Sequence, residues 1–226
     1  ALHAGADVID LKDPNIGALG ALDLETTAQI LKVLDGRATV SATVGEHHVS
    51  QQSLFHEIEA RAGLGLDIVK IAVDKHFDEA DFFDNIAAYT AGVKLVALFF
   101  ADVTINTQLL AKLNQVGFYG AMLDTQNKQR TLLELLTEDT LKMFINECRK
   151  NQLFCGLAGS LKPQYIESLQ DLQPTFIGFR GGVCENNIRK SVLNAEKILQ
   201  IKIMLLKHNK ISNLAQKRWD FALHTI

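Results

Sequence analysis

The stretch DIVKIAV, residues 67–73, is a short β-branched run with one lysine, Lys70, at its centre. Successive side chains of a strand point to opposite faces, so Lys70 lies on one face and Val69 and Ile71 lie on the other. The two apolar side chains need cover from helices. Lys70 therefore points the other way, into an enclosed interior, where a lysine is typical of a functional centre rather than of a solvated surface.

Six further runs of this kind alternate with helical patterns, and strands separated by helices imply parallel pairing. We expect an α/β fold, a TIM (β/α)8-type barrel that lacks its first strand and helix. The chain opens on ALHAGAD, residues 1–7, which is typical of a last helical turn that enters a strand. The predicted strands are 7–12, 38–44, 67–73, 93–100, 118–124, 153–159 and 175–181. The predicted helices are 27–34, 51–62, 82–91, 108–116 and 132–150.

The length of 226 residues and the apolar content of 47% suit one substantial core. We expect a catalytic barrel domain over residues 1–200. Residues 201–226 keep helical apolar spacing beyond the last barrel element, so we expect a C-terminal helical tail there, with Trp219 as an anchor that docks it.

Composition excludes several classes of protein. The net charge is −3 with both signs spread along the chain, which argues against nucleic acid and membrane partners. No run of about 18 apolar residues and no charged-then-apolar leader occurs, so no membrane span or signal peptide is predicted. The three cysteines form no CxxC motif and predict a reducing, cytoplasmic protein without disulfides or zinc. The sequence does not decide whether the chain forms a homo-oligomer.

Two other features are weak candidates for function. His47 and His48 are adjacent, so their side chains diverge, and we expect no metal site there. Cys184 follows a glycine-rich turn, where it is either a reactive thiol or, more commonly, a small buried one.

Polar residues gather at the carboxyl ends of the predicted strands, on the parity that faces the interior. In barrels this end carries catalysis. Only the run 93–100 departs from the pattern and ends in apolar residues. The candidate catalytic residues are Asp10, Lys12, Lys70, Asp124 and Lys128.

Lysines and carboxylates in a closed interior are suited to imine chemistry. A lysine attacks a carbonyl only as the free amine, and both desolvation and neighbouring positive charge lower its pKa. A carboxylate favours the ammonium form, so the aspartates fit better as proton shuttles or as groups that position a lysine. The sequence thus predicts imine formation, α-deprotonation and carbon–carbon bond formation. The alternative is a set of buried ion pairs without a catalytic role.

Glycine-rich turns follow the last two predicted strands, GLAGSLKP at residues 156–163 and GFRGGVCE at residues 178–185. In barrels the loops at these places commonly bind phosphate through backbone amides. The alternative is that the glycines only make tight turns. The candidate phosphate-binding residues are Gly159, Ser160, Arg180, Gly181 and Gly182.

Taken together, these segments resemble the (5-formylfuran-3-yl)methyl phosphate synthase family of methanofuran biosynthesis. The resemblance rests on GADVIDLKDPNIGALGA (5–21), VSATVGE (40–46), DIVKIAV, MLDTQNK (122–128), LAGSLK (157–162) and GFRGGVCE. It implies a TIM barrel without metal or organic cofactor. It also implies a small-molecule phosphosugar substrate: two molecules of glyceraldehyde 3-phosphate condense, with loss of phosphate and water, to a furan aldehyde that keeps one phosphate.

Position by position, the resemblance implies that Lys12 is the Schiff-base lysine and Asp10 the acid two residues before it. Lys70 matches a second active-site lysine, and Asp124 and Lys128 match an aspartate and lysine spaced D-x-x-x-K. The chain departs from the family after Glu185, where the loop is more polar, and in the tail. Two other interpretations remain: another class I phosphosugar aldolase, and a non-catalytic barrel scaffold.

Overall fold

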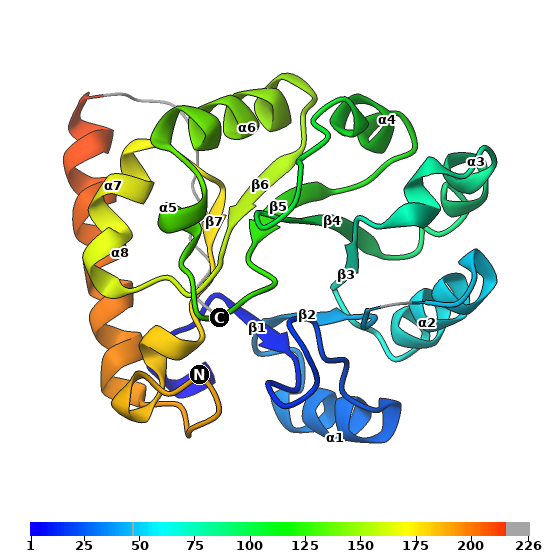
Figure 1. Cartoon of the computed structure of the whole chain (residues 1–226). Helices are drawn as coiled ribbons and strands as arrows, with labels where there is room; N and C mark the ends of the chain where they lie inside the picture. Colours follow the sequence, from blue (N-terminus) through cyan, green and yellow to red (C-terminus); the bar gives the residue numbers. More distant parts are fainter. Residues whose placement is uncertain (47, 216–226) are drawn as a thin grey trace.

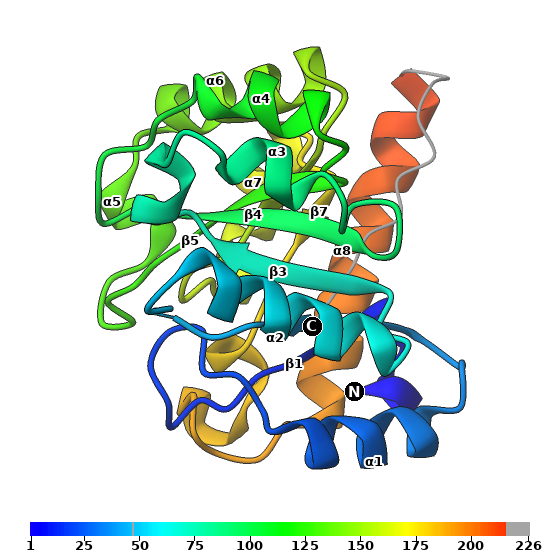
Figure 2. The same cartoon turned by 90° about the vertical axis from the view of Figure 1, so that its right-hand side faces the viewer.

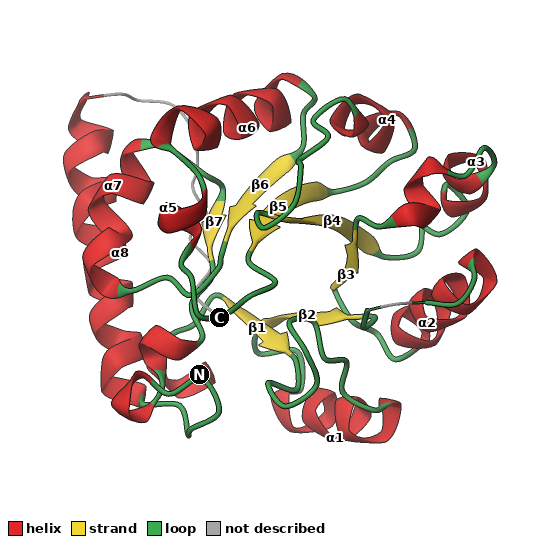
Figure 3. Ribbon diagram, viewed as in Figure 1, coloured by secondary structure: helices red, strands yellow, loops and turns green. Residues whose placement is uncertain are grey.

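The computed structural model describes residues 1–46 and 48–215, with side chains described up to residue 207. Seven parallel strands pair in the order of the sequence and curl around a central space, with the helices on the outer side (Figure 1, Figure 3). This is an α/β barrel with one strand fewer than the eight of a closed TIM barrel, as the sequence predicts. The strands are β1 Val8–Leu11, β2 Thr39–Thr43, β3 Ile68–Ala72, β4 Lys94–Phe100, β5 Gly120–Asp124, β6 Phe154–Leu157 and β7 Phe176–Ile177.

Because β1 and β7 are the first and last strands in this order, they form the two ends of the sheet, and no pairing joins them in the described residues. We call the space between them the seam. A short 3-10 turn, η1 (Leu2–Ala4), enters β1 and ends at Gly5, in agreement with the prediction for residues 1–7. Figure 2 shows the curl of the sheet from the side, with helix α8 (Ala195–Ala215) along one flank.

The described residues form two apolar clusters, one on each face of the sheet. The outer cluster lies between strands and helices and includes Val69 and Ile71. The inner cluster lies inside the curl and includes Val96, Leu98 and Phe100 of β4. The predicted alternation of faces is therefore confirmed, and the apolar end of the run 93–100 is explained: β4 supplies the apolar wall of the interior.

The helices differ from the predictions in three places. The predicted helix 132–150 is two helices, because Leu136 is extended and Thr137 begins a new helix by accepting a hydrogen bond from the Thr140 amide at 3.2 Å. The predicted helix 82–91 ends early, and α7 was not predicted. The helices before α8 are α1 Leu24–Leu34, α2 Gln51–Gly63, α3 Phe82–Ile86, α4 Leu109–Gln115, α5 Leu132–Leu135, α6 Glu138–Lys150 and α7 Ile166–Asp171.

Helix α8 crosses the predicted boundary between residues 200 and 201 without a break. Its side chains Ile198, Ile201 and Leu205 are fully buried in the outer cluster, and Gln170 of α7 donates a hydrogen bond to the Leu205 carbonyl at 3.0 Å. The first part of the predicted tail thus packs as an element of the barrel. Trp219 lies outside the described residues. No helix in the described part is long and apolar enough to span a bilayer.

Candidate active site

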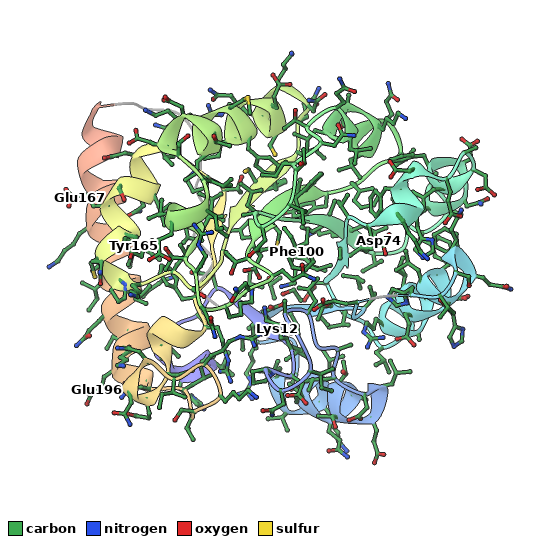
Figure 4. All side chains as sticks on the ribbon, in the orientation of Figure 1. Lys12, Asp74, Phe100, Tyr165, Glu167 and Glu196 are labelled. Atoms are coloured by element: carbon green, nitrogen blue, oxygen red, sulfur yellow. The ribbon has the colours of Figure 1, made fainter. Side chains whose placement is uncertain are left out.

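The predicted site residues converge at the carboxyl ends of the strands, around a cavity of about 340 Å³. Figure 4 shows Lys12 and Phe100 on the inner side of the ring of strands, whereas Glu167 and Glu196 lie on the outer helices. All five predicted phosphate-binding residues line the cavity, and so do four of the five predicted catalytic residues. Lys70 is the exception. It lies deeper and borders a much smaller space beside Ser41 and Val96.

Asp10 and Lys70 form an ion pair that is almost sealed from solvent, with side chains 1% and 5% exposed. They come from β1 and β3, and Ser41 of the strand between them donates a hydrogen bond to Asp10 Oδ1 at 2.7 Å. Burial alone would raise the pKa of Asp10, but the ammonium groups of Lys70 and Lys12 outweigh burial and hold the pKa below its ordinary 3.8. We call Asp10 and Lys70 the inner pair.

The Lys70 amine shows the opposite balance. Burial lowers the pKa of Lys70 below its ordinary 10.5, and the Asp10 carboxylate only partly opposes that shift. A buried amine with a lowered pKa is easier to deprotonate than one in water. The partner of Lys70, Asp10, itself lines the cavity.

Asp124 lies between two lysines at the cavity wall. Lys128 Nζ is 2.7 Å from Asp124 Oδ1, and Lys12 Nζ is 3.8 Å from Asp124 Oδ2. The Thr125 amide also donates a hydrogen bond to Asp124 Oδ1 at 2.7 Å. Burial pushes the pKa of Asp124 upward, but Lys128 and Lys12 overcome that effect and lower it. We call Lys12, Asp124 and Lys128 the mouth cluster.

The two lysines of the mouth cluster are held differently. Lys128 Nζ donates hydrogen bonds to Asp124 and to the Thr125 carbonyl. Burial lowers the pKa of Lys128, while the Asp124 carboxylate opposes the shift. Lys12 Nζ makes no hydrogen bond among the described residues, its side chain is 13% exposed, and it lines the cavity. Lys128 also lines the cavity and its side chain is 19% exposed, so what distinguishes Lys12 is an amine that no hydrogen bond holds among the described residues.

The two glycine-rich turns lie side by side along one wall of the cavity. Gly159 has φ of 115°, and a Cβ there would lie 2.7 Å from Thr125 Cγ2. At Gly182 a Cβ would lie 2.8 Å from the Leu161 carbonyl oxygen. Ser160 donates its hydroxyl proton to the Lys128 carbonyl at 2.9 Å, so in this arrangement that proton is not directed at a bound anion. Close packing by itself thus explains the glycines at positions 159 and 182. Phosphate binding by these turns stays a prediction.

Two residues near the site were missed by the sequence analysis. Ser41 lies on the inward parity of its strand, a signal that could have identified it as a partner of Asp10. Arg189 lines the cavity from the loop after β7. The alternation of strand faces does not apply in a loop, so the sequence carries no signal for the direction of this side chain. Burial lowers the pKa of Arg189, while Asp124 opposes the shift and Arg180 adds to it.

The minor candidates are settled in part. Cys184 is fully buried, and its thiol donates to the Arg180 carbonyl at 3.1 Å, in agreement with the packed alternative. His47 lies outside the described residues. Within residues 1–46 and 48–215, no three His, Cys, Asp or Glu side chains are grouped so that they could hold a metal ion.

A barrel with paired lysines and aspartates at its mouth is common to many enzymes, so the sequence match decides the family. Residues 1–202 match the family described as 4-HFC-P synthase. The chain belongs to this family. It is 39% identical over 201 residues to a protein of Methylorubrum extorquens that provisionally carries the name (5-formylfuran-3-yl)methyl phosphate synthase. That match covers 88% of this chain and 83% of the relative.

A second relative in the 4-HFC-P synthase family, (5-formylfuran-3-yl)methyl phosphate synthase of Methanocaldococcus jannaschii, is 28% identical over 204 residues, 84% of this chain and 87% of the relative. The resemblance predicted from the motifs is confirmed. Among solved structures, phosphoribosyl anthranilate isomerase from Thermus thermophilus aligns with a TM-score of 0.61 at 12% identity, covering 91% of this chain and 90% of that one. A KDPGal structure aligns with a TM-score of 0.59 at 11% identity, covering 94% and 86%. These likenesses show the barrel fold alone.

Proposed function

We propose that this chain is a carbon–oxygen lyase that condenses two molecules of glyceraldehyde 3-phosphate into (5-formylfuran-3-yl)methyl phosphate through a Schiff base on Lys12. The names of its relatives support the product. The observation that carries the mechanism is the Lys12 amine, which lines the cavity without a hydrogen bond among the described residues, next to two ion-paired aspartates.

The first step is attack of Lys12 Nζ on the aldehyde carbon of one triose phosphate. A carbon–nitrogen bond forms, and the carbonyl oxygen leaves as water once it is protonated. Asp124 is 3.8 Å from Lys12 Nζ and is held by Lys128, so this aspartate–lysine pair can relay the protons of that step. Both groups line the cavity and can reach the reacting atoms without leaving their partners.

The second step is carbon–carbon bond formation. Loss of the proton next to the imine carbon gives an enamine, whose carbon attacks the carbonyl of the second triose. Asp10 lines the cavity as a carboxylate paired with Lys70 behind it, so it is placed to accept that proton. Ring closure by attack of a hydroxyl group on the imine carbon then forms a carbon–oxygen bond and expels the Lys12 amine. Elimination releases one phosphate and one further water, so that, with the water of the first step, two trioses balance the furan product, one phosphate and two waters. The glycine turns and Arg180 hold the phosphate that stays.

The test is trapping with borohydride. The protein is incubated with glyceraldehyde 3-phosphate and sodium borohydride, digested, and mapped by peptide mass. We expect a reduced phosphosugar adduct on Lys12, together with strong ultraviolet absorbance of a furan aldehyde in untreated reactions. Lys12→Met is the matched control and should carry no adduct.

Each other outcome contradicts a stated part of the proposal. Furan formation without an adduct on Lys12 would contradict the Schiff base at this residue. An adduct on Lys12 without furan absorbance would indicate another class I aldolase instead of a furan synthase. Neither adduct nor furan in a folded sample would contradict the proposal as a whole.

A further inference from the structure

The loop between β7 and α8 forms a short hairpin over residues 184–193. Cys184 and Leu193 form an antiparallel bridge, and the Glu185 amide donates to the Val192 carbonyl at 2.9 Å. Lys197, in the first turn of α8, donates to the Cys184 carbonyl at 2.8 Å and to Asn187 Oδ1 at 2.9 Å. The hairpin is therefore tied to α8 at its base and at its turn, rather than loose.

The hairpin places Arg189 across the seam. Its guanidinium donates hydrogen bonds to three carbonyl oxygens in the loop between β1 and α1: Pro14 at 3.0 Å, Gly17 at 3.3 Å and Ala18 at 3.4 Å. Figure 2 shows the orange hairpin segment beside the blue β1–α1 loop. Since no pairing joins β1 to β7 in the described residues, Arg189 connects two loops that the sheet itself leaves unconnected.

The β1–α1 loop begins directly after Lys12 and turns back over the interior. The Asp13 amide donates to the Gly20 carbonyl at 2.8 Å, which closes the loop at its base. Leu19 is fully buried in the inner cluster against the apolar wall of β4, and its amide donates to Glu46 Oε1 at 2.5 Å. The loop is thus a cap on the interior, fixed on one side by Leu19 and on the other by Arg189.

We propose that Arg189 is a positioning residue that clamps the β1–α1 loop and thereby holds Lys12 in the cavity for attack on the substrate carbonyl. The inference rests on the proposed function, because it requires Lys12 as the reacting amine. The planar guanidinium suits the task, since it donates from two nitrogens in a fixed fork that a lysine ammonium cannot reproduce. No carboxylate lies within ion-pair distance of Arg189 among the described residues, so the clamp consists of hydrogen bonds to backbone carbonyls.

The first readout does not depend on activity. Hydrogen–deuterium exchange of residues 13–20 is compared in the full-length wild type, Arg189→Ala, Arg189→Lys and Lys190→Ala. Lys190 is the exposed neighbour on the same hairpin, and its side chain makes no hydrogen bond to this loop in the described structure. We expect faster exchange in both Arg189 variants, with unchanged exchange in the strands and in Lys190→Ala. Wild-type exchange of residues 13–20 in Arg189→Ala would overturn the clamp.

The second readout is kinetic. We expect kcat of Arg189→Ala to fall by roughly tenfold to a hundredfold, in line with misplacement of a reacting group by about 1 Å, with KM nearly unchanged. Arg189→Lys, which keeps the charge and loses the fork, should show the same loss of kcat. A raised KM with wild-type kcat, restored by Arg189→Lys, would make Arg189 a substrate ligand and overturn the proposal. If the wild type forms no Lys12 adduct, the proposed function fails, while the exchange experiment still tests the clamp.

Discussion

The inner pair and the mouth cluster use the same residue types in two different environments. Asp10 and Lys70 face each other 1% and 5% exposed, whereas Lys12 and Lys128 share Asp124 at the edge of the cavity, 13% and 19% exposed. Among the described residues, the hydrogen-bond partners that replace water around the Asp10 carboxylate are Lys70 and Ser41. The comparison teaches that burial makes loss of one partner of the inner pair costly for stability, while the mouth cluster offers the Lys12 amine on which we propose that the imine forms.

The largest expected effect is the loss of activity when the Lys12 amine is removed. Lys12→Met should reduce furan formation by a factor on the order of 10³ or more, because it removes the nucleophile. Its free energy of unfolding should stay within about 0.5–1 kcal/mol of wild type, since the Lys12 amine makes no hydrogen bond in the described structure. Steady-state assays and urea unfolding measure the two quantities. Turnover at the wild-type rate in Lys12→Met would show that Lys12 is not the nucleophile.

The next effect concerns the stability of the inner pair. Asp10→Asn leaves the Lys70 ammonium buried without a counter-charge and should lower the free energy of unfolding by about 3–5 kcal/mol. The double variant Asp10→Asn/Lys70→Met removes both charges and should recover part of that loss. Urea unfolding of the two variants beside wild type checks this. A double variant that is less stable than Asp10→Asn would show that the ion pair is not the source of the loss.

A smaller effect is expected at Asp124. Asp124→Asn removes the proposed proton relay and should reduce product formation by about a hundredfold. It should destabilise the fold less than Asp10→Asn does, because Lys12 and Lys128 reach the cavity and can be solvated there. Assay and unfolding are measured on the same preparation. Equal destabilisation by Asp10→Asn and Asp124→Asn would abolish the distinction between the two regions.

The smallest expected effect is the pH dependence of stability. Asp10 has a lower pKa in the folded chain than the ordinary 3.8, because the lysine charges outweigh its burial. The folded state therefore binds fewer protons than the unfolded state in this range. The stability from Asp10 is fully present above pH 3.8 and is lost as pH falls through the folded-state pKa.

Unfolding by urea as a function of pH below 5 measures this dependence. Wild type should lose stability more steeply on acidification than Asp10→Asn/Lys70→Met, which lacks the titrating pair. Parallel pH profiles of the two proteins would contradict the lowered pKa of Asp10.

Much of the site was predictable because strand period and the carboxyl ends of parallel strands are local properties of the chain. Asp10 and Lys70 could be assigned to the interior from the apolar residues beside them, and the turns at Gly159 and Gly182 from their composition. The break at Leu136 was missed because the apolar spacing of a helix continues across it. Thr137 acts as an N-cap only because the backbone before it is extended, and the spacing does not show that.

The sequence by itself determined the seven-stranded barrel, the inward parity of the lysines and aspartates, and the family, because these depend on periodicity and on motifs contiguous in the chain. Only the tertiary structure decided which carboxylate each lysine meets. Asp10 is two residues from Lys12, yet its ion-pair partner is Lys70 on β3, two strands away in the sheet. The register places Asp10 level with Ser41 and Ile68, so Lys70 lies two positions further along β3 on the same face. The same holds for Arg189, whose partners are more than 170 positions away and come together only where the sheet curls back on itself.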